Sequence, residues 1–114
     1  MKLVSTLNSE YYNWGVGSHG CHFLKRDDLS IILEEVPPGD SEIKHFHNHA
    51  RQFFFILEGT ATLEIGKEVH TLQTNEGIEV EPRIAHKFRN NSDSIVRFLV
   101  ISMPRSHGDR TDVE

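Results

Sequence analysis

The segment between residues 39 and 59 constrains this chain more than any other part of its sequence. It places His45 and His47 two positions apart in a strand-like run. Alternate side chains of a strand share one face, so both imidazoles point the same way. Gln52 stands at the head of the next apolar run, and His86 lies in a similar run much later in the chain. We expect these four side chains to converge on a metal ion inside a β-barrel.

Short runs rich in β-branched and aromatic residues are separated by turn residues along the whole chain. Clusters of Gly, Pro, Asn and Asp recur about every 8–12 residues, which is typical of β-sandwiches and barrels. No window sustains the amphipathic period of a helix. The sequence therefore predicts an all-β fold with little helix, with strands over residues 22–25, 29–36, 42–47, 52–57, 60–65, 68–72, 77–80, 85–89 and 95–102.

Length and charge limit the class of protein. At 114 residues the chain is expected to form a single domain, 1–114. An N-terminal arm is expected over about residues 1–20, and a polar, partly disordered tail over about residues 105–114. The formal net charge is −5, from 12 basic and 17 acidic residues, and no basic run is present. We therefore expect no binding to nucleic acid.

Cysteine usage and hydropathy indicate the compartment. The single cysteine, Cys21, excludes an internal disulfide, which suits a reducing environment, and we expect it to be a small buried residue rather than a nucleophile. The N-terminal residues lack the apolar core of a signal peptide. No run reaches the ~20 apolar residues of a membrane span. These features predict a cytoplasmic protein that has no membrane partner.

One predicted strand is apolar on both faces. If Gln52 and Phe54 face the barrel interior, then Phe53, Phe55 and Leu57 face outward. An outer apolar stripe of this kind needs a cover. The cover is either the N-terminal arm or a second subunit, and because C2 dimers are the commonest oligomers, we expect a homodimer.

The other histidines have weaker claims to a ligand position. His49 shares the parity of His45 and His47 and competes for such a position, but we expect it at the turn near the mouth of the pocket. The remaining four follow no ligand spacing and are expected on the surface or in structural roles: His19, His22, His70 and His107.

Two further sets of residues are expected away from the ligands. The first set alternates out of phase with the ligands and should face outward: Lys44, Lys87 and Arg89. The second set could wall a pocket, but we expect its members to pack the N-terminal arm on the barrel: Tyr11, Tyr12 and Trp14.

The histidine pattern resembles that of small single-domain cupins, the RmlC-like double-stranded β-helix family. The first motif of that family is G-x5-H-x-H-x(3,4)-E-x6-G. Here Gly39, His45, His47 and Gly59 keep every spacing, and Gln52 stands in the place of the glutamate.

The second family motif, G-x5-P-x-G-x2-H-x3-N, is matched with one departure. Gly77, Pro82, His86 and Asn90 occur in the right order. The interval from Gly77 to His86 is two residues short, and residues 84–85 stand where the inner glycine is expected. We therefore expect a tighter turn before His86 than the family pattern has, with the assignment of His86 unchanged.

The resemblance implies a double-stranded β-helix (cupin) barrel that binds one divalent metal ion (Zn, Fe, Mn or Ni) through His45, His47, Gln52 and His86. Three imidazoles and one amide oxygen leave two positions of an octahedron open to water or substrate. Glutamate would cancel part of the metal charge, whereas glutamine leaves it whole. Such a site is expected to favour an anionic, bidentate substrate such as a 2-oxo acid, an enolate or a uronate.

Three functions stay open at this point. The first is an enzyme that isomerises a sugar acid or adds dioxygen to a small oxygenated metabolite. The second is a module that binds a small molecule without turnover. The third is a barrel with a structural metal, although structural metals are normally coordinated fully by protein. An interior acid or base beyond the ligands would favour the enzyme, but sequence does not fix the facing of the candidates: Glu42, Glu64, Glu79, Glu81 and Arg97.

Overall fold

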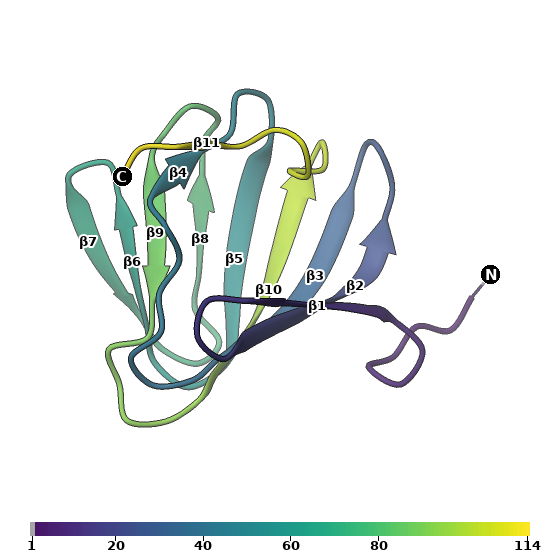
Figure 1. The fold of residues 1–114 in the computed structure, drawn as a ribbon, viewed down its shortest axis with the longest axis horizontal. Coiled ribbons are helices and arrows are strands. Elements are labelled where there is room, and N and C mark those ends of the chain that lie inside the picture. Colours follow the sequence, from purple (N-terminus) through teal and green to yellow (C-terminus); the bar gives the residue numbers. More distant parts are fainter. Residues whose placement is uncertain (1) are drawn as a thin grey trace.

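The computed structural model describes residues 2–114, and this part of the chain contains eleven strands and no helix (Figure 1). The predicted all-β class is therefore confirmed. No apolar helix of membrane-spanning length is present in residues 2–114. The strands are β1 (Glu10–Trp14), β2 (Ser18–Lys25), β3 (Ser30–Val36), β4 (His45–Phe46), β5 (Arg51–Glu58), β6 (Ala61–Ile65), β7 (Glu68–Leu72), β8 (Gly77–Val80), β9 (His86–Arg89), β10 (Val96–Met103) and β11 (Thr111–Asp112).

The strands form two antiparallel sheets. The six-stranded sheet has the order β1-β2-β3-β10-β5-β8, and the five-stranded sheet has the order β11-β4-β9-β6-β7. Every predicted strand has a counterpart, although the run predicted over residues 42–47 is a strand only at His45–Phe46. Long-range pairs such as β3 with β10 and β4 with β9 alternate with short hairpins such as β6–β7. This alternation brings residues 45 and 86 side by side.

The two chain ends differ from the sequence prediction. The expected N-terminal arm contains a hairpin, in which β1 pairs with β2 from Glu10↔His22 to Trp14↔Ser18. The tail expected to be partly disordered contains β11, which pairs with β4. β11 pairs only with the distant β4, and β1 is an edge strand whose residues are mostly exposed or partly exposed, so neither strand has a strong apolar pattern in the sequence.

Phenylalanines from both sheets meet in the core. Phe54 and Phe98 come from the six-stranded sheet and Phe88 comes from the five-stranded sheet. The ring centroids of Phe88 and Phe98 lie 4.0 Å apart, and Phe54 stacks on them at 6.2 and 6.1 Å. Burying each of these rings contributes about 1.5–3 kcal/mol. Phe54 also lies 6.0 Å from the ring of His86, so the aromatic core adjoins the histidines.

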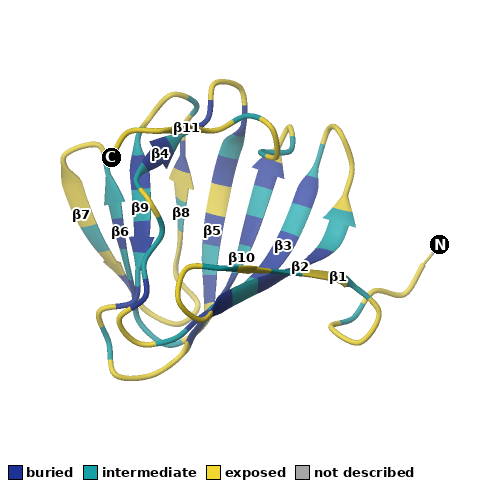
Figure 2. Cartoon of the chain, viewed as in Figure 1, coloured by how far each residue is buried: buried dark blue, intermediate teal, exposed yellow. Residues whose placement is uncertain are grey.

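Strand β5 alternates as predicted. Gln52, Phe54 and Ile56 are buried, whereas Phe53 and Leu57 are exposed, and Figure 2 shows the resulting bands along β5. The alternation of a strand thus places Gln52 in the barrel interior. The prediction of an inward and an outward face for this strand is confirmed.

The outer apolar stripe is not covered by the N-terminal residues, contrary to one of the two expectations. Strand β1 lies at the far edge of the six-stranded sheet, and its Tyr12 and Trp14 pack against the barrel core. Phe53 remains 40% exposed and Leu57 36% exposed. Cover by a second subunit stays a prediction.

Asp40 holds the β1–β2 hairpin against the barrel. Its Oδ2 accepts hydrogen bonds from the backbone N–H of Val16 (3.0 Å) and Gly17 (3.2 Å) and from the hydroxyl of Ser18 (2.5 Å). Gly15 has a φ of +59°, and a Cβ there would lie 2.5 Å from the Asp40 carboxylate. The tight turn and its buried anchor therefore fix where β1 places its side chains.

Candidate metal centre

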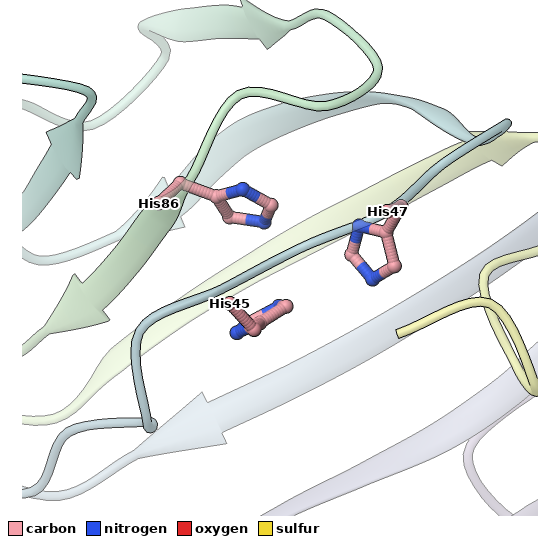
Figure 3. Close-up of side chains that lie close together, drawn as sticks. All are labelled: His45, His47 and His86. Carbon is pink, nitrogen blue, oxygen red and sulfur yellow. The ribbon is translucent and has the colours of Figure 1, made fainter. Parts of the chain in front are cut away.

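Two strands of the five-stranded sheet bring three histidines together. His45 begins β4, His47 follows that strand directly, and His86 begins β9 as the cross-strand partner of His45. One ring nitrogen of each lies within 4.8 Å of the others, and all three side chains are buried. Figure 3 shows the three imidazoles converging from these two segments. This cluster could hold a metal ion.

Backbone carbonyls orient two of the imidazoles. The Nδ1 of His45 lies 2.6 Å from the carbonyl oxygen of Ile43, and the Nδ1 of His86 lies 3.0 Å from that of Ile84. Since a carbonyl only accepts, Nδ1 of His45 carries the proton and donates, which leaves its Nε2 unprotonated for a metal. His86 has an acceptor oxygen beside each ring nitrogen, because Gln52 Oε1 lies 3.1 Å from its Nε2, and the Nδ1–H tautomer is the one that could bind a metal through Nε2. Support through Nδ1 is what metal-binding histidines usually have.

All three histidines are neutral at physiological pH. Burial lowers the pKa of His45 to about 4, even though the Ile43 carbonyl acts to raise it. Burial, together with the neighbouring His45 and His86, lowers the pKa of His47 to about 3. Burial also lowers the pKa of His86. Neutral imidazole is the form that binds metals, so no proton has to be removed first.

Gln52 places its carboxamide oxygen beside the cluster. Its Oε1 lies 3.1 Å from Nε2 of His86. Its Nε2 donates to the hydroxyl of Ser102 at 3.0 Å, which fixes the orientation of the amide. All four residues predicted for the site are therefore buried and close together in the barrel interior. His49, the competing candidate, is exposed in the β4–β5 turn and is not part of the cluster.

His45, His47 and Gln52 line a cavity of about 510 Å³, and His86 lies behind them. Cavities of roughly 300–1,000 Å³ suit small-molecule ligands. Tyr12 and Trp14, expected to pack the N-terminal arm on the barrel, do pack against the core and also line this cavity. His107, expected on the surface or in a structural role, is exposed and lies at the cavity wall. The polar and aromatic residues of the wall include Tyr12, Trp14, Glu34, Glu42, His45, His47, Gln52, Phe54, His107 and Arg110.

A tyrosine–glutamate pair forms one part of this wall. Tyr12 pairs with Gly20 on β2, and Gly20 pairs with Glu34 on β3, so the glycine lies between the two side chains. The Tyr12 hydroxyl passes over Gly20 and donates to Oε2 of Glu34 at 2.5 Å. Burial raises the pKa of Glu34 to about 7, although the Tyr12 hydroxyl acts to lower it. Burial also raises the pKa of Tyr12, so its hydroxyl stays protonated.

A second carboxyl, Glu42, faces the same cavity. Its Oε1 accepts a hydrogen bond from the backbone N–H of Phe88 at 3.0 Å. Burial, and next the charge of Glu34, raise the pKa of Glu42 to about 8. The two carboxyls therefore supply acid and base groups that work near neutral pH.

Most of the other charged candidates pair outside the cavity. Glu64 pairs with Arg89 (3.2 Å) and Glu79 with Arg51 (2.6 Å). Arg97 pairs with Glu35 at 2.9 Å. Of the five residues whose facing was open, only Glu42 lines the cavity within residues 2–114.

Sequence reasoning missed Glu34. It shares strand parity with Ile32 and Val36, which are buried, and that parity was the available signal. The signal is weak because Leu33, of opposite parity, is also buried, so β3 is apolar on both faces.

A model of the cupin domain family matches residues 32–102. This range runs from β3 into β10 and contains the three clustered histidines. The match confirms the resemblance seen in the two histidine motifs.

Two curated relatives come from Streptomyces. Protein SchB of Streptomyces halstedii is 27% identical over 64 residues, which cover 56% of this chain and 46% of SchB. Polyketide synthase CurC of Streptomyces cyaneus is 26% identical over 67 residues, which cover 59% of this chain and 44% of CurC. The alignments thus span less than half the length of either relative.

A solved structure with the same architecture is the polyketide cyclase RemF from Streptomyces resistomycificus. The TM-score is 0.80 at 20% sequence identity, covering 92% of this chain and 80% of that one. A likeness at this identity shows the fold, and it confirms the expected all-β double-stranded β-helix.

Proposed function

The chain belongs to the cupin family, and from this premise we propose that it is a divalent-metal-dependent enzyme that moves protons on a small carbonyl compound. One observation carries the proposal: two of the clustered histidines, His45 and His47, line the same cavity as two carboxyls with raised pKa values, Glu34 and Glu42. Burying a carboxyl costs stability. Two such groups beside metal ligands therefore favour catalysis over a purely structural metal.

We assign the metal to His45, His47, His86 and Gln52. The donor set fits a divalent ion such as Zn, Fe, Mn or Ni, because the imidazoles are neutral and two of them are oriented through Nδ1. The Ser102 hydroxyl holds the Gln52 amide so that its oxygen lies on the side of His86. When bound, such an ion supplies a Lewis acid that polarises a carbonyl oxygen.

Glu34 is the proposed proton acceptor. With a pKa of about 7 it is partly ionised at neutral pH, which suits a base that must also return its proton. Its Oε2 is engaged by the Tyr12 hydroxyl, so Oε1 is the atom that takes a proton from the carbon beside the substrate carbonyl. Tyr12 stays protonated and holds the carboxylate in position.

Glu42 is the proposed proton donor. Its pKa of about 8 keeps it protonated at neutral pH. Because Oε1 accepts from the backbone of Phe88, Oε2 carries the proton and delivers it to a substrate oxygen. Together the two carboxyls convert a ketone to its enol: one proton leaves carbon for Glu34 and one leaves Glu42 for oxygen.

The substrate class follows from the wall of the cavity and from the relatives. Tyr12, Trp14 and Phe54 present aromatic surface, which favours a flat, partly apolar molecule. CurC is described as a polyketide synthase and RemF as a polyketide cyclase. Polyketides carry carbonyls on alternate carbons, and the protons between them are acidic. An enolisable polycarbonyl compound therefore fits best, and isomerisation of a sugar acid would use the same proton transfers.

The test is deuterium incorporation at the carbon beside a carbonyl, followed by NMR. The purified protein is analysed for metal and then incubated in D₂O with aryl ketones, β-keto esters and sugar acids. Glu34→Gln should slow exchange about 10²–10⁴-fold. Glu35→Gln is the matched control, because Glu35 is the next residue on β3 but pairs with Arg97 on the outer face, and it should leave exchange unchanged.

The outcomes separate the candidate functions. An exchange rate equal to that of buffer for every carbonyl and every metal would refute the proposal. Oxygen uptake without exchange would indicate dioxygenation instead. A ligand-dependent rise in melting temperature without turnover would indicate a binding module.

A further inference from the structure

The C-terminal segment, residues 105–114, crosses one end of the barrel and closes part of the cavity (Figure 1). The Asp109 carboxylate accepts hydrogen bonds from the backbone N–H groups of Asn48 (2.7 Å), His49 (2.8 Å) and Ala50 (3.0 Å). Glu114 accepts from the ammonium of Lys87 at 2.7 Å. The segment is thus fixed at residues 109 and 114.

Arg110 lies between these two anchors. It is the one lysine or arginine among residues 2–114 that lines the cavity. Its Nε donates to Oδ1 of Asp112 at 2.8 Å, and its Nη2 makes a long contact of 3.4 Å with the carbonyl of Ile43. Asp112 therefore orients the guanidinium through Nε, and the contact with Ile43 uses one hydrogen of Nη2, so Nη1 and the second hydrogen of Nη2 are left for a ligand.

Asp112 forms an ion pair with Arg110, and the carboxyls across the cavity add only part of their charge. Glu34 and Glu42 have pKa values of about 7 and about 8, both raised chiefly by burial, so together they carry less than two negative charges at neutral pH. A metal ion would add positive charge. Arg110 is therefore the group in the cavity wall that offers charged N–H donors to an anion, although the chain has a formal net charge of −5.

We propose that Arg110 determines substrate specificity by binding a carboxylate, and that the substrate is a small keto acid. A guanidinium binds a carboxylate through two parallel N–H···O bonds, which a lysine does not reproduce. With the carboxylate at Arg110, the keto group extends into the cavity toward the histidine cluster. This inference rests on the proposed function, because it names the substrate of the same cavity.

Binding can be measured without turnover. Trp14 is the only tryptophan of the chain and lines the cavity, so its fluorescence reports occupancy. Metal-free and Zn²⁺-loaded protein are titrated with 2-oxo-4-phenylbutanoate and with its uncharged methyl ester. The acid should bind about 10–100-fold more tightly than the ester in both forms, as expected for hydrogen bonds to a charged group.

Variants locate that preference. Arg110→Gln should abolish the preference for the acid over the ester. Arg110→Lys should retain only part of that preference, because lysine keeps the positive charge but lacks the paired N–H donors of the guanidinium. Arg105→Gln is the matched control: Arg105 lies on the same segment, pairs with Asp27 at 3.5 Å and does not line the cavity. This control should keep the full preference for the acid.

Several results would overturn the inference: equal affinity for acid and ester, an unchanged preference in Arg110→Gln, or an equal loss in Arg105→Gln. If Arg110→Gln does not fold, Arg110→Lys decides, and an unchanged preference there overturns the inference. If no deuterium exchange is observed but the protein still binds the acid more tightly than the ester, only the proposed function is refuted. Exchange without that preference refutes the role of Arg110 alone.

Discussion

Replacing Gly20 with alanine should damage both the stability and the chemistry of the cavity. A Cβ at this position would lie 2.5 Å from the Tyr12 hydroxyl oxygen, 2.6 Å from Tyr12 Cζ and 3.0 Å from Glu34 Cγ. Ordinary contacts of a Cβ begin at 3.4 Å. The Tyr12 ring therefore has to move away, and its hydrogen bond to Glu34 is lost.

The expected change in the free energy of unfolding combines three effects. Overpacking a filled site costs about 1–3 kcal/mol. Losing a hydrogen bond from Tyr12 to Glu34 costs about 1 kcal/mol more. Alanine also lowers the conformational entropy of the unfolded chain at position 20, which stabilises the folded protein by about 0.4–1 kcal/mol. Gly20→Ala should therefore destabilise the protein by about 1–4 kcal/mol, which lowers the melting temperature by roughly 5–15 °C.

The same variant should shift the pH dependence of the exchange reaction. The Tyr12 hydroxyl lowers the pKa of Glu34 against the larger effect of burial, and the result is about 7. Without that hydrogen bond the pKa rises, so the pH at which the base becomes active moves upward. Tyr12→Phe should produce the same shift without the steric cost.

Gly17→Ala provides the control for this experiment. Gly17 lies in the same hairpin, and a Cβ there would meet only Pro37 Cγ, at 3.4 Å. Its stability should stay within about 1 kcal/mol of wild type. Wild-type stability and an unchanged pH profile in Gly20→Ala would refute the contact on which the assignment of Glu34 depends.

Three further predictions concern the metal, the outer face and the buried carboxyls. Gln52→Glu should bind the metal more tightly in chelator competition and lower activity on an anionic substrate, because the carboxylate adds charge; a gain in activity would contradict this. If a second subunit covers the stripe of Phe53, Phe55 and Leu57, Phe55→Glu should lower stability by about 2–4 kcal/mol and elute as a monomer in gel filtration. An unchanged elution volume and melting temperature would rule out cover of the stripe by a second subunit. Glu42→Gln should stabilise the protein by about 1–3 kcal/mol at pH 8, as measured by urea titration. The pKa of Glu42 is raised from 4.5 to about 8 in the folded protein, so the stability of the wild type falls as pH rises between these two values. Equal pH dependence of stability in the two proteins would contradict this prediction.

The sequence alone determined the features that depend on the alternation of side chains between the two faces of a strand. The spacing of His45 and His47 placed both imidazoles on one face, and Gln52 set the parity of β5, so the burial of Phe54 could be stated in advance. Turn residues located the ends of most strands. His86 was identified from its motif, and the structure shows it as the cross-strand partner of His45. These features are local, or are tied to a recognisable pattern, and periodicity therefore predicts them.

Only the tertiary structure decided which other side chains reach the cavity. Glu34 lies in a strand that is apolar on both faces, and its neighbour Tyr12 reaches it only because β1, Gly20 and β3 align in register. Arg110 enters the wall because Asp109 binds a turn about sixty residues earlier in the chain. Strand pairing and barrel closure join segments whose separation in sequence leaves no periodic signal. The proposed metal ligands could therefore be identified from the sequence, whereas the positions of the proposed acid, the proposed base and Arg110 depend on the closing of the barrel.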